Sequence, residues 1–446
     1  MNNDIISRKG ERVIDEFDNE LVIGETLSRG GQGIVFKAKR DPDIAIKQPI
    51  DSNTGQLDFS ADYQLRFLEV RCLPIPENIH IALPMSILKN EPGYVMRLLN
   101  GMAPLSRLSL NGEEKEHYAG APTYKWLEGL DADRAALLLH YAETGSTKSR
   151  LRVLYKCAAT LSRLHFAGLV YNDLSPNNIF FGEDGDVWLI DSDNIRYEHR
   201  AGGETFLTYR YGAPELVQVT DSARPCTDIW SFAVIAFETL ALVHPFIGKK
   251  VLNPEEEIGG WDCDTEAEAD DPPSDLDDQA YSGYLPYIDD IDDDSNEGVT
   301  GLPRELVLTP MMRQLFQQTL GYGRLTPWKR SSMVFWALAL AQAHDTSLSC
   351  PQCGMSYYLG EEECPYCGNN KPDYTIASSS NWDMVIQGDT GEYQLPHRLL
   401  FPFSVSKCDE VEYEVFINFE DESAAPARGF GPLPDGLSFV FVKGGL

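Results

Sequence analysis

Residues 171–179 read Tyr-Asn-Asp-Leu-Ser-Pro-Asn-Asn-Ile and place two polar side chains, Asp173 and Asn178, five residues apart. This stretch follows a helix-like segment, and Asp191 lies eighteen residues after Asp173. Two carboxylates and an amide on adjacent loops suit a Mg²⁺-nucleotide, because hard oxygen ligands hold the ion while a further carboxylate orients an attacking hydroxyl. Asp173 or Asn178 alone could be an ordinary turn residue. Their joint order and spacing favour phosphotransfer chemistry.

A glycine cluster and a lysine precede this stretch. Residues 27–36 read L-S-R-G-G-Q-G-I-V-F between two strand-like runs. A glycine-rich hairpin lets backbone amides approach phosphate oxygens, although this segment alone could be a simple turn. Ile44-Ala45-Ile46-Lys47 predicts a strand that ends in a half-buried lysine. Its best anionic partner is Glu69 on a helix predicted over 59–71; alternatively, Lys47 extends to the surface.

Together these segments resemble the eukaryotic-type Ser/Thr protein kinase superfamily from about Leu21 to Gln342. The resemblance implies that Lys47 binds ATP phosphates, that Glu69 holds Lys47 and that Asp173 is the catalytic base. It implies Asn178 and Asp191 as ligands of Mg²⁺ or Mn²⁺. The family's glycine loop has serine here in place of its first glycine. The residues that the resemblance assigns to the ATP site are Ser28, Gly30, Gly33, Val35, Ala45, Lys47, Met96, Leu98 and Leu99.

Further family segments follow downstream. Ala213-Pro214-Glu215 matches the A-P-E segment, and Arg330 is placed like the late arginine that pairs with its glutamate. Thr208 lies where Ser/Thr-selective members carry a threonine beside the catalytic aspartate. Residues 228–232 match the start of the buried central helix. The resemblance covers about three quarters of the chain.

Several positions depart from the family pattern. Asn172 replaces the arginine that receives a phosphorylated activation loop, so a phosphate-driven switch is not expected. Tyr171 replaces a structural histidine, and Ser175 replaces a lysine that steadies the γ-phosphate. Asp191-Ser192-Asp193 replaces D-F-G, which predicts a site that is less easily switched. Two alternatives to an active kinase therefore stay open. One is a nucleotide-binding pseudokinase scaffold; the other, a small-molecule phosphotransferase, is disfavoured by Thr208 and the A-P-E segment.

The chain order predicts a two-lobed α+β kinase-like fold, followed by a zinc ribbon and a small β-rich domain. Residues 1–97 form the expected N-lobe and 98–345 the C-lobe, with an acidic insertion at 251–303. Strands are predicted at Leu21–Ile23, Gly33–Ala38, Ile44–Lys47, Tyr94–Leu98, Glu412–Phe419 and Leu437–Val442, and helices at 59–71, 151–167 and 229–242, with two or three more over 304–342.

The net charge of the chain limits the classes of partner that it is expected to bind. The net charge is −32, and the stretch 251–300 holds eighteen Asp or Glu residues without Lys or Arg. Such an acidic chain repels phosphate backbones, so we expect protein substrates and neither nucleic acid nor membrane as partners. The start of the chain carries no signal peptide, which predicts a cytoplasmic protein. The acidic stretch is either a solvated loop or a docking surface for a basic partner.

Two C-P-x-C-G knuckles, separated by ten residues, predict a structural Zn²⁺ site formed by Cys350, Cys353, Cys364 and Cys367. The expected ribbon spans 346–372, and the β-rich domain spans 373–446. A kinase followed by such a ribbon resembles bacterial kinases encoded beside a von Willebrand A-domain protein and a phosphatase in tellurite-resistance triads. That resemblance implies those two proteins as partners.

Overall fold

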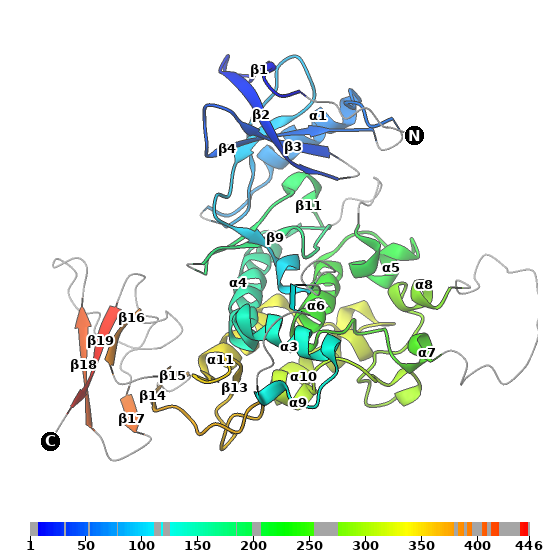
Figure 1. Cartoon of the computed structure of the whole chain (residues 1–446). Coiled ribbons are helices and arrows are strands. Elements are labelled where there is room, and N and C mark those ends of the chain that lie inside the picture. The colour runs from blue at the N-terminus through cyan, green and yellow to red at the C-terminus, as the bar shows by residue number, and fades with distance from the viewer. Residues whose placement is uncertain are drawn as a thin grey trace, which may run out of the picture.

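The computed structural model shows a sheet lobe joined to a helical lobe, with further strands after them (Figure 1). It describes residues 8–30, 33–51, 54–77, 79–110, 117–118, 125–183, 185–198, 207–253, 275–378, 382–387, 390–394, 404–407, 412–418 and 438–444. Among these residues, no helix combines the length and apolar character needed to cross a membrane.

The N-terminal lobe is an antiparallel sheet of six strands in the order β1-β2-β3-β4-β6-β5. One helix, α1 (Ala61–Cys72), packs beside it through Phe67 and Val70, which are buried. The predicted strands and helix of this lobe are confirmed within a few residues. The strand bounds are β1 (Arg12–Ile14), β2 (Glu20–Arg29), β3 (Gly33–Ala38), β4 (Ile44–Pro49), β5 (Pro84–Ile87) and β6 (Tyr94–Arg97).

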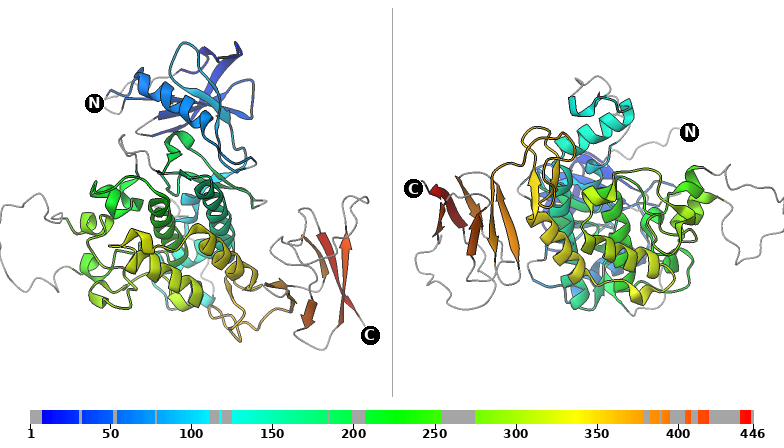
Figure 2. Two further views of the ribbon diagram at one scale, coloured as in Figure 1. Left: turned by 180° about the vertical axis from the view of Figure 1, so that it is seen from behind. Right: turned by 90° about the horizontal axis from the view of Figure 1, so that it is seen from below.

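The helical lobe is built around α6 (Pro225–Ala241), which is buried along most of its length. Its apolar sequence predicted this position, since a helix that is hydrophobic all round belongs in a core. Figure 2 shows the other helices gathered about it. They are α3 (Ala132–Glu143), α4 (Ser146–Phe166), α5 (Pro214–Val217), α7 (Lys249–Leu252), α8 (Leu276–Tyr281), α9 (Arg304–Val307), α10 (Pro310–Phe316) and α11 (Met333–Asp345).

Short antiparallel strands carry the loops between the two lobes. They are β7 (Ala103–Pro104), β8 (Leu169–Val170), β9 (Ile179–Phe181), β10 (Val187–Leu189) and β11 (Arg196–Tyr197). Strand β9 pairs with β10 and β7, and β8 pairs with β11. The catalytic-loop stretch therefore runs between β8 and β9, and the Asp191 turn follows β10.

The acidic insertion is more ordered than the sequence indicated. Residues 254–274 lie outside the described residues, but α8 and the segment after it pack into the helical lobe. Leu285, Tyr287 and Ile288 belong to the main core, and the buried Asn296 amide donates to the carbonyls of Phe246 and Pro286. The expectation of a solvated loop is therefore wrong from residue 276 onward, because apolar side chains interrupt the charges there.

The chain continues from α11 into the strands β12 (Ser347–Ser349) and β13 (Ser356–Tyr358), which pair with each other. Two three-stranded sheets follow, in the orders β15-β14-β17 and β16-β19-β18. They confirm the expected strands of the tail. Their bounds are β14 (Tyr374–Ser378), β15 (Asp383–Gln387), β16 (Thr390–Gln394), β17 (Ser404–Lys407), β18 (Glu412–Asn418) and β19 (Ser438–Gly444).

Candidate active site

The catalytic loop is held in place by a carboxylate at the start of α6. The buried Asp228 accepts hydrogen bonds from the backbone N–H of Tyr171 at 2.7 Å and of Asn172 at 2.8 Å. Asn172 has a φ of 76°, a left-handed conformation that asparagine tolerates better than most residues. The Tyr171 hydroxyl donates to the carbonyl of Ile190, so it also ties the catalytic loop to the Asp191 turn.

Asp173 lies beside Thr208, as the sequence predicted. The Thr208 hydroxyl donates to Asp173 Oδ1 at 3.0 Å, and the Asn178 amide donates to the Asp173 carbonyl at 2.9 Å. Burial raises the pKa of the Asp173 carboxyl, the charge of Asp191 raises it further, and the Thr208 hydrogen bond lowers it. Asp173 is thus a carboxylate with raised basicity and a fixed orientation.

Lys47 joins this group from strand β4, but its partner differs from the expectation. Its ammonium contacts the carboxylate of Asp191, and lies 2.7 Å from Asp193 Oδ2. Among the described residues Glu69 is not a partner of Lys47; it lies exposed on α1. Burial alone would lower the Lys47 pKa, but the two carboxylates outweigh it and raise that pKa. The predicted Lys47–Glu69 pair is therefore corrected to Lys47 with Asp191 and Asp193.

The proposed ATP-site residues of the sheet lie close together. Ala45 and Met96 are direct partners across β4 and β6 and belong to one small apolar cluster, against which Val35 and Leu98 pack. Leu99 follows in the segment that leads to the helical lobe.

The glycine loop reaches the same place. Ser28 pairs with Val35 across β2 and β3, and the Gly30 N–H donates to the Gly33 carbonyl at 2.9 Å. A Cβ on Gly33 would lie 3.3 Å from Lys47 Cε, so this glycine permits close approach of the hairpin to the lysine.

Two segments tie the lobes together behind Asp191. The hydroxyl of the fully buried Ser192 donates to the Ala82 carbonyl at 2.9 Å, and the Ala82 N–H donates to the Leu189 carbonyl at 2.8 Å. His80 stacks on Trp188 with ring centroids 4.9 Å apart. Ser192 stands where the family's D-F-G segment has phenylalanine. It makes a hydrogen bond to the neighbouring loop in place of an aromatic packing contact.

A buried ion pair supports the segment after Thr208. Arg330 donates to both oxygens of Glu215, at 2.6 and 2.9 Å, and its guanidinium lies 4.8 Å from the ring centroid of Trp230. The Arg330 side chain is fully buried. The pairing predicted from the sequence is confirmed.

Replacing Arg330 by Met is expected to lower the free energy of unfolding by about 3–5 kcal/mol, because it leaves the Glu215 carboxylate buried without its cation. Urea unfolding measures the loss. Arg224→Met is the matched control: Arg224 pairs with Asp221 at the surface, both side chains being more than 40% exposed, so its removal should cost under about 1 kcal/mol. Equal losses in the two variants would contradict the structural role of the buried pair.

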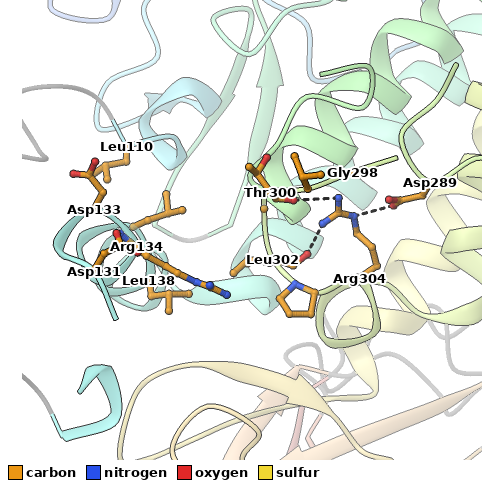
Figure 3. A pocket seen from close by; sticks show the side chains of 14 residues that line it. Leu110, Asp131, Asp133, Arg134, Leu138, Asp289, Gly298, Thr300, Leu302 and Arg304 are labelled. Atoms are coloured by element: carbon orange, nitrogen blue, oxygen red, sulfur yellow. Dashed lines mark hydrogen bonds and ion pairs between the residues drawn. The ribbon is translucent and has the colours of Figure 1, made fainter. Parts of the chain in front are cut away.

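Two cavities of the described residues differ in their relation to the predicted site. One, of about 610 Å³, lies between α3 and residues 298–304; Figure 3 shows Arg304 bound there to Asp289 and to backbone carbonyls. None of its lining residues belongs to the predicted site. The other, of about 780 Å³, is lined by Leu98 and Leu99 together with Trp188 and several polar residues.

The four predicted metal-binding cysteines converge. The sulfur atoms of Cys350, Cys353, Cys364 and Cys367 all lie within 4.8 Å of one another. Cys353 is hydrogen-bonded to Cys364, which lowers the pKa of the Cys364 thiol. Four thiols at this spacing fit a tetrahedral metal ion.

The cysteine-rich segment, residues 346–372, is not a separate unit. Met355 and Tyr357 belong to the same buried cluster as the helical lobe. The Ser146 hydroxyl accepts from the Ser356 N–H, and the Tyr358 hydroxyl donates to the Val307 carbonyl. The cysteine-rich segment thus covers the N-terminal end of α4.

The part of the chain that carries Asp173, Asn178 and Asp191 is similar to known proteins. Residues 124–280 match the protein kinase domain. Serine/threonine-protein kinase PknL of Mycobacterium tuberculosis is 32% identical over 143 residues, which are 28% of this chain and 35% of PknL. Mouse ribosomal protein S6 kinase alpha-2 is 35% identical over 250 residues, 54% of this chain and 29% of that kinase.

Mouse ribosomal protein S6 kinase alpha-3 is 38% identical over 101 residues, 22% of this chain and 13% of that kinase. The chain thus spans 35% or less of the length of these relatives. The domain match spans the catalytic loop, the Asp191 turn and Thr208.

Two residues of this site were not predicted from the sequence. Asp193, which contacts Lys47, was expected only as a departure from D-F-G, and Tyr94, whose hydroxyl donates to Asp193, only as a strand residue. A signal for both was present: a second acid two residues after Asp191, and a tyrosine that pairs with Lys47 across β4 and β6. The anchoring role of Asp228 was also not predicted.

Proposed function

We propose that the protein is an ATP-dependent Ser/Thr protein kinase that transfers the γ-phosphoryl group to a protein hydroxyl. The observation that carries this proposal is the convergence of Lys47, Asp173, Asn178 and Asp191 from both lobes. Lys47 steadies the α and β phosphates. Asp173 orients the substrate hydroxyl and accepts its proton, which its raised pKa favours.

Asn178 and Asp191 would hold Mg²⁺, since an amide and a carboxylate oxygen are ligands that this ion accepts. When bound, the ion neutralises developing charge on the phosphates. The backbone of Asp191, with φ 60° and ψ 53°, keeps its carboxylate beside Lys47. The small apolar cluster around Ala45 and Met96 is where we place the adenine ring.

Purified protein with radiolabelled ATP tests the proposal. Transfer of label to the protein or to a Ser/Thr-containing substrate supports a kinase. Nucleotide binding without any transfer would favour the pseudokinase scaffold, for which the absence of the lysine at Ser175 is the relevant departure.

Thr208→Val is expected to move the acid limb of the kcat/KM profile to higher pH. The lost hydrogen bond had stabilised the charged carboxylate, so its removal raises the Asp173 pKa further. Because a base acts in its deprotonated form, activity should then be lost at a higher pH than in the wild type. Thr208→Ser keeps a hydroxyl and should retain the wild-type profile. Superimposable profiles for wild type and Thr208→Val would disprove the link.

We further propose that the four cysteines hold a structural Zn²⁺ and that the protein acts in the cytoplasm on protein substrates. The von Willebrand A-domain protein and the phosphatase that the resemblance implies are the first partners to test. Phosphosite mapping after co-expression with them would identify the substrate.

A further inference from the structure

Lys47 is held by an acid that does not belong to helix α1. In kinases the catalytic lysine is held by a glutamate of the helix that packs on the sheet, and the position of that helix controls activity. Here α1 turns Phe67 and Val70 toward the sheet, with exposed fractions of 1% and 2%. Glu69 lies two residues from Phe67, so its Cβ leaves the helix on a different face, and it is exposed.

Asp193 occupies the place that the glutamate leaves. Its Oδ2 lies 2.7 Å from the Lys47 ammonium, and its Oδ1 accepts a hydrogen bond of 2.5 Å from the Tyr94 hydroxyl. Its side chain is only 8% exposed. Both oxygens of this carboxylate are therefore used by donors from the N-terminal lobe.

The two donors belong together in the sheet. Lys47 on β4 pairs directly with Tyr94 on β6, and side chains of directly paired residues leave the same face of an antiparallel sheet. The Tyr94 ring is also fixed from its other side, because its centroid lies 4.6 Å from that of Phe67. The sheet thus presents one cation and one hydroxyl donor to a single acid.

Asp193 is itself held in place by the turn on which it lies. It lies in a short 3₁₀ turn, Ser192–Asn194, whose three residues are all buried. The neighbouring Ser192 is bound to the Ala82 carbonyl. The acid therefore comes on a fixed turn, next to the proposed metal ligand Asp191.

We propose that Asp193, assisted by Tyr94, is the positioning residue for Lys47 and does the work that a helix glutamate does in related kinases. The lysine then keeps its orientation without any movement of α1. The proposal rests on the proposed function, in which Lys47 binds the ATP phosphates.

The test compares Asp193→Asn with Glu69→Gln in the full-length protein, with two measurements on each variant. One is affinity for a non-hydrolysable ATP analogue with Mg²⁺, and the other is the KM for ATP and kcat. Loss of a charge-assisted hydrogen bond should weaken analogue binding and raise the KM for ATP by about tenfold or more for Asp193→Asn. The effect of Glu69→Gln should be several-fold smaller. Asp41→Asn, which removes an exposed acid of the same lobe, controls for net charge.

Two further variants exclude a general loss of structure. Asp193→Glu, which keeps the carboxylate, should recover part of the affinity that Asp193→Asn loses. Tyr94→Phe should weaken analogue binding in the wild type but have little effect in the Asp193→Asn background, because both act through the same contact. Equal or larger effects of Glu69→Gln, or additive effects of Tyr94→Phe, would overturn the proposal. If the wild type binds the analogue but transfers no phosphate, the proposed function fails while the binding measurements still decide the role of Asp193.

Discussion

Asp173→Asn is expected to reduce kcat for phosphoryl transfer by about 10²–10⁴, with an unchanged melting temperature. The amide retains the shape of the side chain and can still meet the Thr208 hydroxyl, but it cannot accept the proton of the substrate hydroxyl. Since Asp173 lies on a loop held by Asp228 through backbone groups, the substitution leaves the anchoring of the loop intact. Transfer of ³²P from ATP to a protein substrate measures the effect.

The matched control is Asp186→Asn, which removes an exposed carboxylate from the turn between β9 and β10. It should leave kcat within about twofold of the wild type, because surface ion pairs of this kind contribute little. ATP-analogue binding should stay close to wild type in both variants, which separates a lost base from a lost nucleotide site. Wild-type transfer by Asp173→Asn would remove Asp173 from the catalytic role.

Removing the proposed zinc from the four cysteines is expected to lower the melting temperature of the sheet and helical lobes by about 10 °C or more. Structural zinc contributes folding free energy directly, and a loss of several kcal/mol shifts the melting of a domain of this size by that order. The loss of stability should extend to the two lobes because Cys350, Cys353 and Cys364 share one core with side chains of α4 and α11. Metal analysis should find one zinc per chain.

Thermal melting with and without a zinc chelator, and of Cys364→Ser, measures this loss. Cys72→Ser is the control, because Cys72 is exposed at the end of α1. A chain without metal that melts as the wild type does, and keeps its kinase activity, would show that the cysteine-rich segment does not support the catalytic lobes.

The sequence could predict the site residues that lie close together along the chain. The catalytic loop and the Asp191 turn could be recognised from the order and spacing of their polar residues. The Glu215–Arg330 pair, whose members lie 115 residues apart, was predicted only through the family resemblance. The positions of β3, β4, β6, α4 and α6 follow from residue type and apolar periodicity.

The choice between Glu69 and Asp193 as the partner of Lys47 depends on how α1 is rotated against the sheet, and the second acid after Asp191 did not by itself decide it. Glu69 and Phe67 both occupy an amphipathic helix, and only the packing of Phe67 against Tyr94 decides which face is buried. Charge misled the interpretation of residues 276–303, where Tyr287 and Ile288 lie among many acids. The docking of the segment around Met355 against the helical lobe was not predicted.

The docking of the cysteine-rich segment has a practical consequence for shortening the chain. A protein trimmed after the last helix that the family resemblance covers would lose Leu348, Met355 and Tyr357, which are at most 2% exposed. The apolar side chains of the helical lobe that pack against them would then be uncovered. Newly bared apolar patches of this kind promote aggregation. A shortened protein that contains both lobes should therefore extend at least to Gln387, because Val385 belongs to the same core and the Trp382 indole donates to Asp345.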